Sequence, residues 1–67
     1  MNIRKYRDAM GWSLERVAVA MEEEGEAVTR QTCHNWEVGK CQPGGRKLLA
    51  LARVFGVEPG KLYEDGE

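Results

Sequence analysis

Apolar residues recur along this chain with the spacing of amphipathic helices. In three segments they stand three, four and seven positions apart, which places them on one face of a helix. The three stripes comprise Ile3, Tyr6 and Met10; Leu14, Val17, Ala18 and Met21; and Leu48, Leu51, Ala52 and Phe55. No stretch alternates apolar and polar residues as a half-buried strand does. The pattern therefore predicts an all-α fold.

Glycine and small polar residues divide this pattern into separate helices. Gly11 is expected to end the first helix, and Ser13 is a favourable N-cap for the second. Thr29 suits the N-cap of a third helix, residues 29–37, and Gly39 suits the position after its end. These positions set the expected limits of the first three helices.

Two further segments complete the prediction. A fourth helix is expected over about residues 46–55, with Gly56 after its end. Proline is tolerated at the first position of a helix, so a short fifth helix, Pro59–Tyr63, would bury Leu62. The sequence therefore predicts five helices.

The chain is short, and its charges are segregated. Its 67 residues allow one small core, which argues against the deep cleft of an enzyme. We expect one domain over residues 1–63 and an acidic, frayed tail over residues 64–67. The net charge is −1, but four glutamates lie within residues 22–26 and three acids within the tail, so the remainder is basic. A local basic field can attract a polyanion even when the total charge is negative.

The sequence carries no pattern for export, membrane insertion or metal binding. No apolar run approaches the roughly 18 residues that a membrane span needs, and the N-terminal residues do not resemble a signal peptide. Two cysteines, Cys33 and Cys41, are too few for a disulfide framework, so a reduced cytoplasmic protein is expected. Cys33 and His34 point about 100° apart on a helix, which disfavours a zinc site. Neither a cofactor nor a catalytic group is expected.

The most specific pattern combines the third helix, the turn after it and the apolar residues of the last two helices. The residues that carry it are Val28–Lys40 (VTRQTCHNWEVGK), Pro43, Leu48–Ala52 (LLALA), Phe55–Val57 (FGV) and Leu62–Tyr63. From Ile3 to Tyr63 the chain resembles the phage repressor and Cro family of helix-turn-helix proteins. The resemblance implies a five-helix, repressor-like domain that binds double-stranded DNA. It also implies a transcriptional regulator, acting as a repressor, of bacterial or phage type.

The chain departs from the family pattern at two points. The family usually has a four-residue turn between its second and third helices, whereas Glu22–Ala27 lengthen this connection. Either the second helix extends through Glu24 and breaks at Gly25, or the loop bulges. The family also often has a glutamine early in the second helix that contacts a phosphate. Leu14 stands there instead, so that contact is either lost or taken by Arg16.

The resemblance places the third helix in the major groove of DNA, and the chemistry of its residues suits that role. Arginine can bond guanine, and glutamine or asparagine can bond adenine, through two hydrogen bonds each. Cations near the helix can contact phosphates. The candidate base-reading residues are Arg30, Gln31, Thr32, His34 and Asn35 beside the N-cap Thr29, and the candidate phosphate contacts are Lys40, Arg46 and Arg16.

Arg7 and Glu37 match two positions that pair in the family. The resemblance therefore implies a largely buried, bidentate ion pair that ties the first helix to the third. Loss of one partner would then strand a charge in the protein interior.

Two partners besides DNA are considered. Regulators of this family commonly bind as dimers, so a homodimer is one. The other is a protein that binds the acidic run Glu22–Glu26. If no such partner exists, we expect this run to point away from DNA. In this alternative the chain is a protein-interaction module on a helix-turn-helix scaffold, and its DNA binding is weak or lost.

Overall fold

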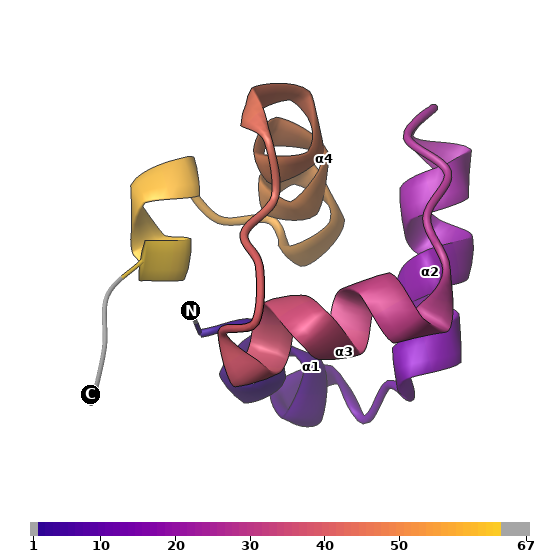
Figure 1. The fold of residues 1–67 in the computed structure, drawn as a ribbon. Helices are drawn as coiled ribbons and strands as arrows, with labels where there is room; N and C mark the ends of the chain where they lie inside the picture. The colour runs from indigo at the N-terminus through magenta and orange to yellow at the C-terminus, as the bar shows by residue number, and fades with distance from the viewer. Residues whose placement is uncertain (1, 64–67) are drawn as a thin grey trace.

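Four α-helices and a terminal 3₁₀ turn form the computed structural model, which describes residues 2–63 (Figure 1). They are α1 (Ile3–Met10), α2 (Leu14–Glu23), α3 (Arg30–Val38), α4 (Gly45–Phe55) and η1 (Pro59–Tyr63). The all-α prediction is confirmed. The predicted tail, 64–67, lies outside the described residues. Within residues 2–63, no helix is both long enough and apolar enough to cross a membrane.

The predicted fifth helix is wrong in type. Pro59–Tyr63 forms a 3₁₀ turn, in which the Lys61 N–H donates to the Glu58 carbonyl at 2.9 Å. Five residues are too few to sustain an α-helix, whereas a 3₁₀ turn is commonly this short. The turn is held from outside, because the Asn2 N–H donates to the Leu62 carbonyl at 2.9 Å and the Leu62 side chain is fully buried.

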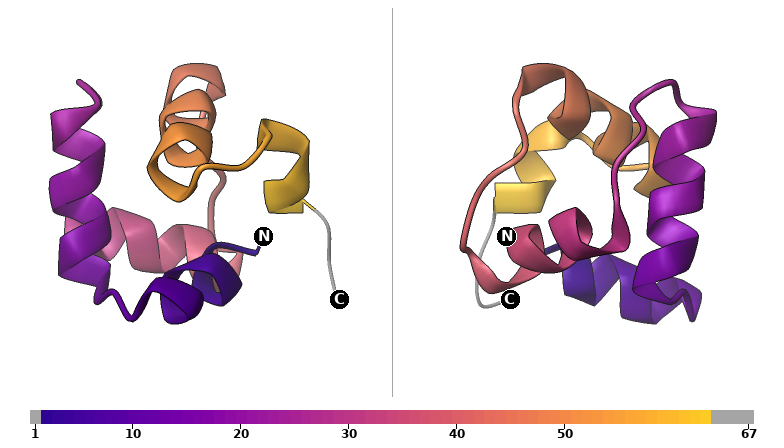
Figure 2. Two further views of the ribbon diagram at one scale, coloured as in Figure 1. Left: turned by 180° about the vertical axis from the view of Figure 1, so that it is seen from behind. Right: turned by 45° about the vertical axis from the view of Figure 1, so that its right-hand side comes forward.

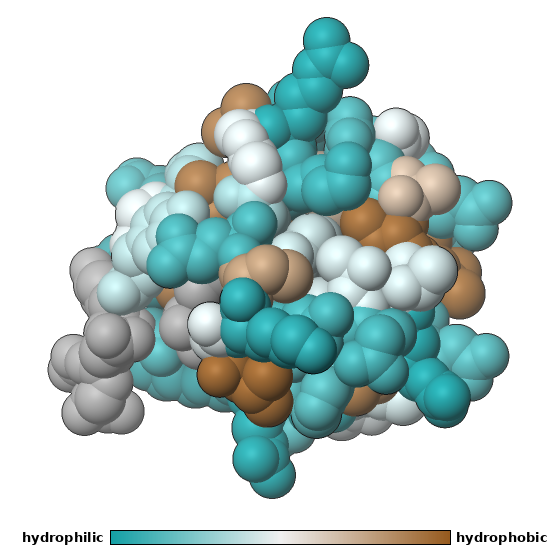
Figure 3. Space-filling view, viewed as in Figure 1, coloured by the Kyte–Doolittle hydropathy of each residue, from teal (hydrophilic) through white to brown (hydrophobic). Residues whose placement is uncertain are grey.

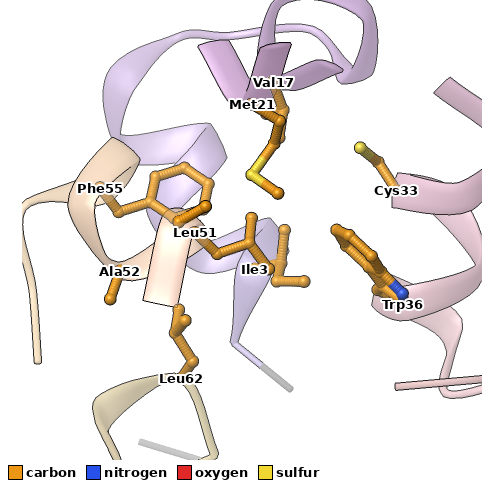
Figure 4. Packing of buried hydrophobic residues seen from close by; sticks show 10 residues of the cluster. Ile3, Val17, Met21, Cys33, Trp36, Leu51, Ala52, Phe55 and Leu62 are labelled. Carbon is orange, nitrogen blue, oxygen red and sulfur yellow. The ribbon is translucent and has the colours of Figure 1, made fainter. Parts of the chain in front are cut away.

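All five elements contribute to one apolar core (Figure 4). The stripes predicted most of it, but Met10 remains 44% exposed because α1 ends there and the chain turns away at Gly11. Tyr63, at the end of η1, is also 44% exposed. The largest fully buried side chains are those of Ile3, Met21, Leu51, Leu62, Val17 and Cys33.

The lengthened connection between α2 and α3 is formed by a longer helix and an extended segment. α2 continues to Glu23, and the Gly25 and Glu26 N–H groups then donate back to the Glu22 and Met21 carbonyls at 2.9 and 3.0 Å. Gly25 has a φ of 87°, a left-handed conformation that favours glycine. Of the two predicted alternatives, the structure therefore has the helix that breaks at Gly25. The chain then runs beside α2 to the start of α3 (Figures 1 and 2).

The arrangement of the helices leaves one side of α3 uncovered. α3 packs crosswise against α2 and also contacts α1, while α4 packs against α2 and η1. In Figure 1, α3 lies in front of α1; seen from behind, in the left view of Figure 2, α1 lies in front of α3. The outer side of α3 is therefore available to a partner.

Candidate nucleic-acid interface

α3 begins at a well-formed cap. Thr29 has the extended backbone of an N-cap, and its Oγ1 accepts a hydrogen bond from the Thr32 N–H at 3.1 Å. The hydroxyl oxygens of Thr29 and Thr32 lie 3.0 Å apart and share a second hydrogen bond. The remaining free N–H groups of the first turn and the helix dipole favour an anion at this end. The cap therefore fixes where α3 starts and makes that end attractive to phosphate.

α3 has one buried face and one outer face. Cys33 and Trp36 are buried in the core, and burial raises the pKa of the Cys33 thiol to about 11. On the outer face the side chains are exposed or half-buried, and Figure 3 shows mainly hydrophilic residues over this part of the surface. The structure thus brings the five predicted base-reading residues together on one helix: Arg30, Gln31 and His34 are exposed, and Thr32 and Asn35 are half-buried.

An ion pair between α1 and α3 fixes the position of the helix. Arg7 Nε donates to Glu37 Oε2 at 2.6 Å, and Arg7 Nη2 donates to Glu37 Oε1 at 3.2 Å. Arg7 Nη1 also donates to the Trp12 carbonyl at 2.9 Å. The two ion-paired side chains are only 15% and 6% exposed. The hydrogen bond with Glu37 raises the pKa of Arg7, and burial partly offsets this rise. Because the net shift is upward, the guanidinium remains charged. This is the bidentate geometry that the resemblance implies.

Three exposed cations stand near the ends of α3 along the chain. Arg30 is the first residue of α3, Lys40 follows its end, and Arg46 lies in the first turn of α4. Within residues 2–63, none of the three has an acidic partner. Their charges are therefore available to the phosphates of a nucleic acid.

Arg16 has a different environment. Its guanidinium lies over the Trp12 ring, 4.6 Å from the ring centroid, and that ring faces Phe55 of α4 at a centroid distance of 6.3 Å. These contacts join Arg16 to the Trp12–Phe55 cluster. Leu14, at the position where the family often has glutamine, is half-buried and packs against the core. Arg16 is exposed, so its role as a phosphate contact stays a prediction.

The acidic run is partly neutralised by α4. Glu26 Oε1 lies 3.5 Å from Lys47 Nζ, and Glu24 Oε1 lies 3.9 Å from Arg53 Nη1. Glu22 and Glu23 are exposed at the end of α2. Two of the four glutamates are therefore directed toward α4.

The sequence analysis did not predict two contacts, one within α3 and one between the acidic run and α4. Gln31 Nε2 donates to Asn35 Oδ1 at 3.1 Å, which ties two candidate base-reading side chains to each other. Their four-residue spacing on a helix is the signal that could have revealed this contact. The pair formed by Glu26 and Lys47 joins residues 21 positions apart, and no local pattern indicates it.

Comparison with known proteins gives one match. A protein-family model, HTH_3, described as "Helix-turn-helix", matches residues 3–62. No curated protein and no solved structure matches. The matched residues include all four α-helices and most of η1.

Proposed function

The chain belongs to the HTH_3 helix-turn-helix family of DNA-binding, non-enzymatic domains, and from this premise we propose that it is a sequence-specific transcriptional regulator. It reads the major groove of double-stranded DNA with α3 and acts as a repressor of bacterial or phage type. The observation that carries this proposal is the uncovered outer face of α3. That face presents a guanidinium and two amides, the groups that pair with base edges, at Arg30, Gln31 and Asn35.

The charges around α3 support the same mode of binding. The exposed Arg30, Lys40 and Arg46 provide cations for the phosphates on either side of a groove. The N-terminal end of α3, capped by Thr29, favours an anion as well. Phosphate contacts would orient α3 on the duplex, and base contacts would select the sequence. Arg16, which is exposed and lies over Trp12, is a further proposed phosphate contact.

The alternative function, a protein-interaction module that uses the acidic run, has weaker support. Glu24 and Glu26 are already paired with Arg53 and Lys47, which leaves a smaller acidic surface for a partner. The homodimer expected from the resemblance stays a prediction. The exposed apolar side chains of Leu49 and Tyr63 on α4 and η1 are compatible with it.

Duplex binding at several salt concentrations tests the proposed function. Sites are first selected from a random duplex pool, and affinity is then measured by fluorescence anisotropy. The affinity should fall steeply with salt, with a slope of about 0.9 in log units for each phosphate contacted. Lys40→Ala should weaken binding to all sequences and reduce that slope by about 1. Combined alanine substitution of Arg30, Gln31 and Asn35 should abolish the preference for the selected site.

A charge-matched control separates these effects from simple loss of a cation. Arg4→Ala removes one positive charge from the exposed surface of α1, where Arg4 lies 3.6 Å from Asp8. This variant should retain the sequence preference. Absence of duplex binding at low salt, or an unchanged preference in the triple variant, would refute the proposed function. Light scattering on the free and bound protein reports whether one or two chains bind each site.

A further inference from the structure

The hydrogen bond between Gln31 and Asn35 bears on how α3 reads bases. Gln31 is exposed, Asn35 is half-buried, and the Gln31 Nε2 to Asn35 Oδ1 distance is 3.1 Å. The amide nitrogen of glutamine carries two hydrogens, so this bond leaves one N–H and the carbonyl Oε1 unused. One donor and one acceptor are what a bidentate pair with adenine N7 and N6 requires. The contact thus leaves Gln31 able to read adenine.

The positions of the two side chains along α3 assign them different roles. Gln31 is the second residue of α3, and the N-terminal residues of a recognition helix are those that reach base edges. Asn35 lies one turn further along, and its side chain is one methylene shorter. Its Oδ1 already accepts one hydrogen bond, from Gln31. Gln31 is therefore the better placed of the two for contact with a base.

We propose that Asn35 is a positioning residue, which holds the Gln31 amide so that the two act as one adenine-reading unit. This inference rests on the proposed function of α3. In water, an exposed amide pair of this spacing is only weakly stabilising. In a groove from which water is displaced, an amide group without a hydrogen-bond partner costs free energy. The hydrogen bond between Asn35 and Gln31 is therefore more stabilising in the complex than in water.

Independent reading by Asn35 is the competing mode, and it predicts a different result. If Asn35 bonded its own adenine, its removal would affect a second base pair and leave the Gln31 position intact. If Asn35 acts through Gln31, both substitutions affect the same A·T pair. The two modes are therefore separated by which base pair loses discrimination, not by the loss of affinity.

The experiment uses the full chain and duplexes in which each base pair of the selected site is changed in turn. Gln31→Ala and Asn35→Ala should lose discrimination at the same A·T pair, by about tenfold, since a bidentate pair of this kind contributes on this scale. The double substitution should lose no more than Gln31→Ala alone. Asn35→Asp keeps the acceptor for Gln31 Nε2 and should preserve the preference, while its added charge weakens binding to all duplexes alike.

The variants are expected to fold, because only the backbone carbonyl of Asn35 takes part in closing α3, where it accepts from the Lys40 N–H at 2.9 Å. Helical circular dichroism checks this. The inference is overturned if Asn35→Ala changes a different base pair or none, or if Asn35→Asp loses the preference as Asn35→Ala does. Absence of salt-dependent duplex binding by the unsubstituted chain would instead overturn the proposed function, and this inference with it.

Discussion

Replacing Arg7 by methionine strands the Glu37 carboxylate at the contact between α1 and α3. Both nitrogens that bond Glu37 belong to this guanidinium, at 2.6 and 3.2 Å. Within the described residues, Arg7 is the only cation that pairs with Glu37, whose side chain is 6% exposed. Methionine retains an unbranched chain that can fill most of the same space, so the substitution tests the charge more than the volume.

The expected loss follows from that burial. Removing one partner of a buried ion pair costs about 3–5 kcal/mol, because the other charge is left without compensation. A chain of this size has a free energy of unfolding of roughly 3–10 kcal/mol. Arg7→Met should therefore remove a large share of the stability. Glu37→Gln should cost less, since Arg7 is 15% exposed and keeps its bond to the Trp12 carbonyl at 2.9 Å.

Urea titration followed by circular dichroism and tryptophan fluorescence measures these differences. With a slope of about 1 kcal/mol per molar urea, typical of a small domain, the midpoint of Arg7→Met should fall by about 3 M. Combining Arg7→Met with Glu37→Met removes both charges and should recover much of the loss, because apolar replacement of a whole pair is often nearly neutral. The double substitution should therefore be more stable than Arg7→Met alone.

Either of two results would show that Arg7 and Glu37 do not act as a buried ion pair. One is a loss below about 1 kcal/mol for Arg7→Met, the range of an exposed ion pair. The other is additivity of Arg7→Met and Glu37→Met in the double variant, since residues that form one buried pair must show an interaction energy.

Three further predictions concern single elements, each followed by urea titration. Thr29→Ala should cost about 1 kcal/mol through loss of the N-cap acceptor, and an unchanged midpoint would contradict this. Gly25→Ala should cost about 1–2 kcal/mol because φ is 87°. Gly45→Ala, at a helical position with open space around it, should not lower the free energy of unfolding. Equal losses for Gly25→Ala and Gly45→Ala would contradict a left-handed backbone at Gly25. The pKa of the buried Cys33 thiol is raised from 9.0 to about 11, so the unfolded chain loses this proton first. The free energy of unfolding should thus fall by about 1.4 kcal/mol per pH unit from pH 9 to 11. Cys33→Ala should lack this fall in the free energy of unfolding between pH 9 and 11. An identical pH dependence in the two proteins would contradict the raised pKa of Cys33.

The features predicted correctly from the sequence depend on contacts between near neighbours. The cap at Thr29 and the helix end at Gly39 involve residues within a few positions of each other, so residue type and spacing were sufficient. At Gly25, residue type and spacing were not sufficient. A helix that breaks at Gly25 was one of two alternatives, the other being a bulged loop, and residue type alone did not distinguish them; the structure has the break, with a φ of 87° at Gly25. The bounds of η1 were also correct, but its short length favours 3₁₀ over α geometry.

The features that were missed depend on contacts between distant residues. Lys47, early in α4, pairs with Glu26 of the connection between α2 and α3, 21 positions away in the sequence. The ring contact between Trp12 and Phe55, at a centroid distance of 6.3 Å, likewise joins residues far apart in the sequence. Each of these outcomes is set by how α2 and α4 pack, which a local pattern does not specify.

The same long-range pairs determine which charges of the chain are left without a partner. Pairing of Glu24 and Glu26 with Arg53 and Lys47 removes two acids and two cations together from the charges available to a ligand. The exposed cations without such partners include Arg30, at the start of α3, and Lys40, just after its end. The lengthened connection thus directs part of its negative charge toward α4. Since attraction to phosphate is a local effect, the net charge of −1 does not oppose the proposed binding of a duplex near these cations.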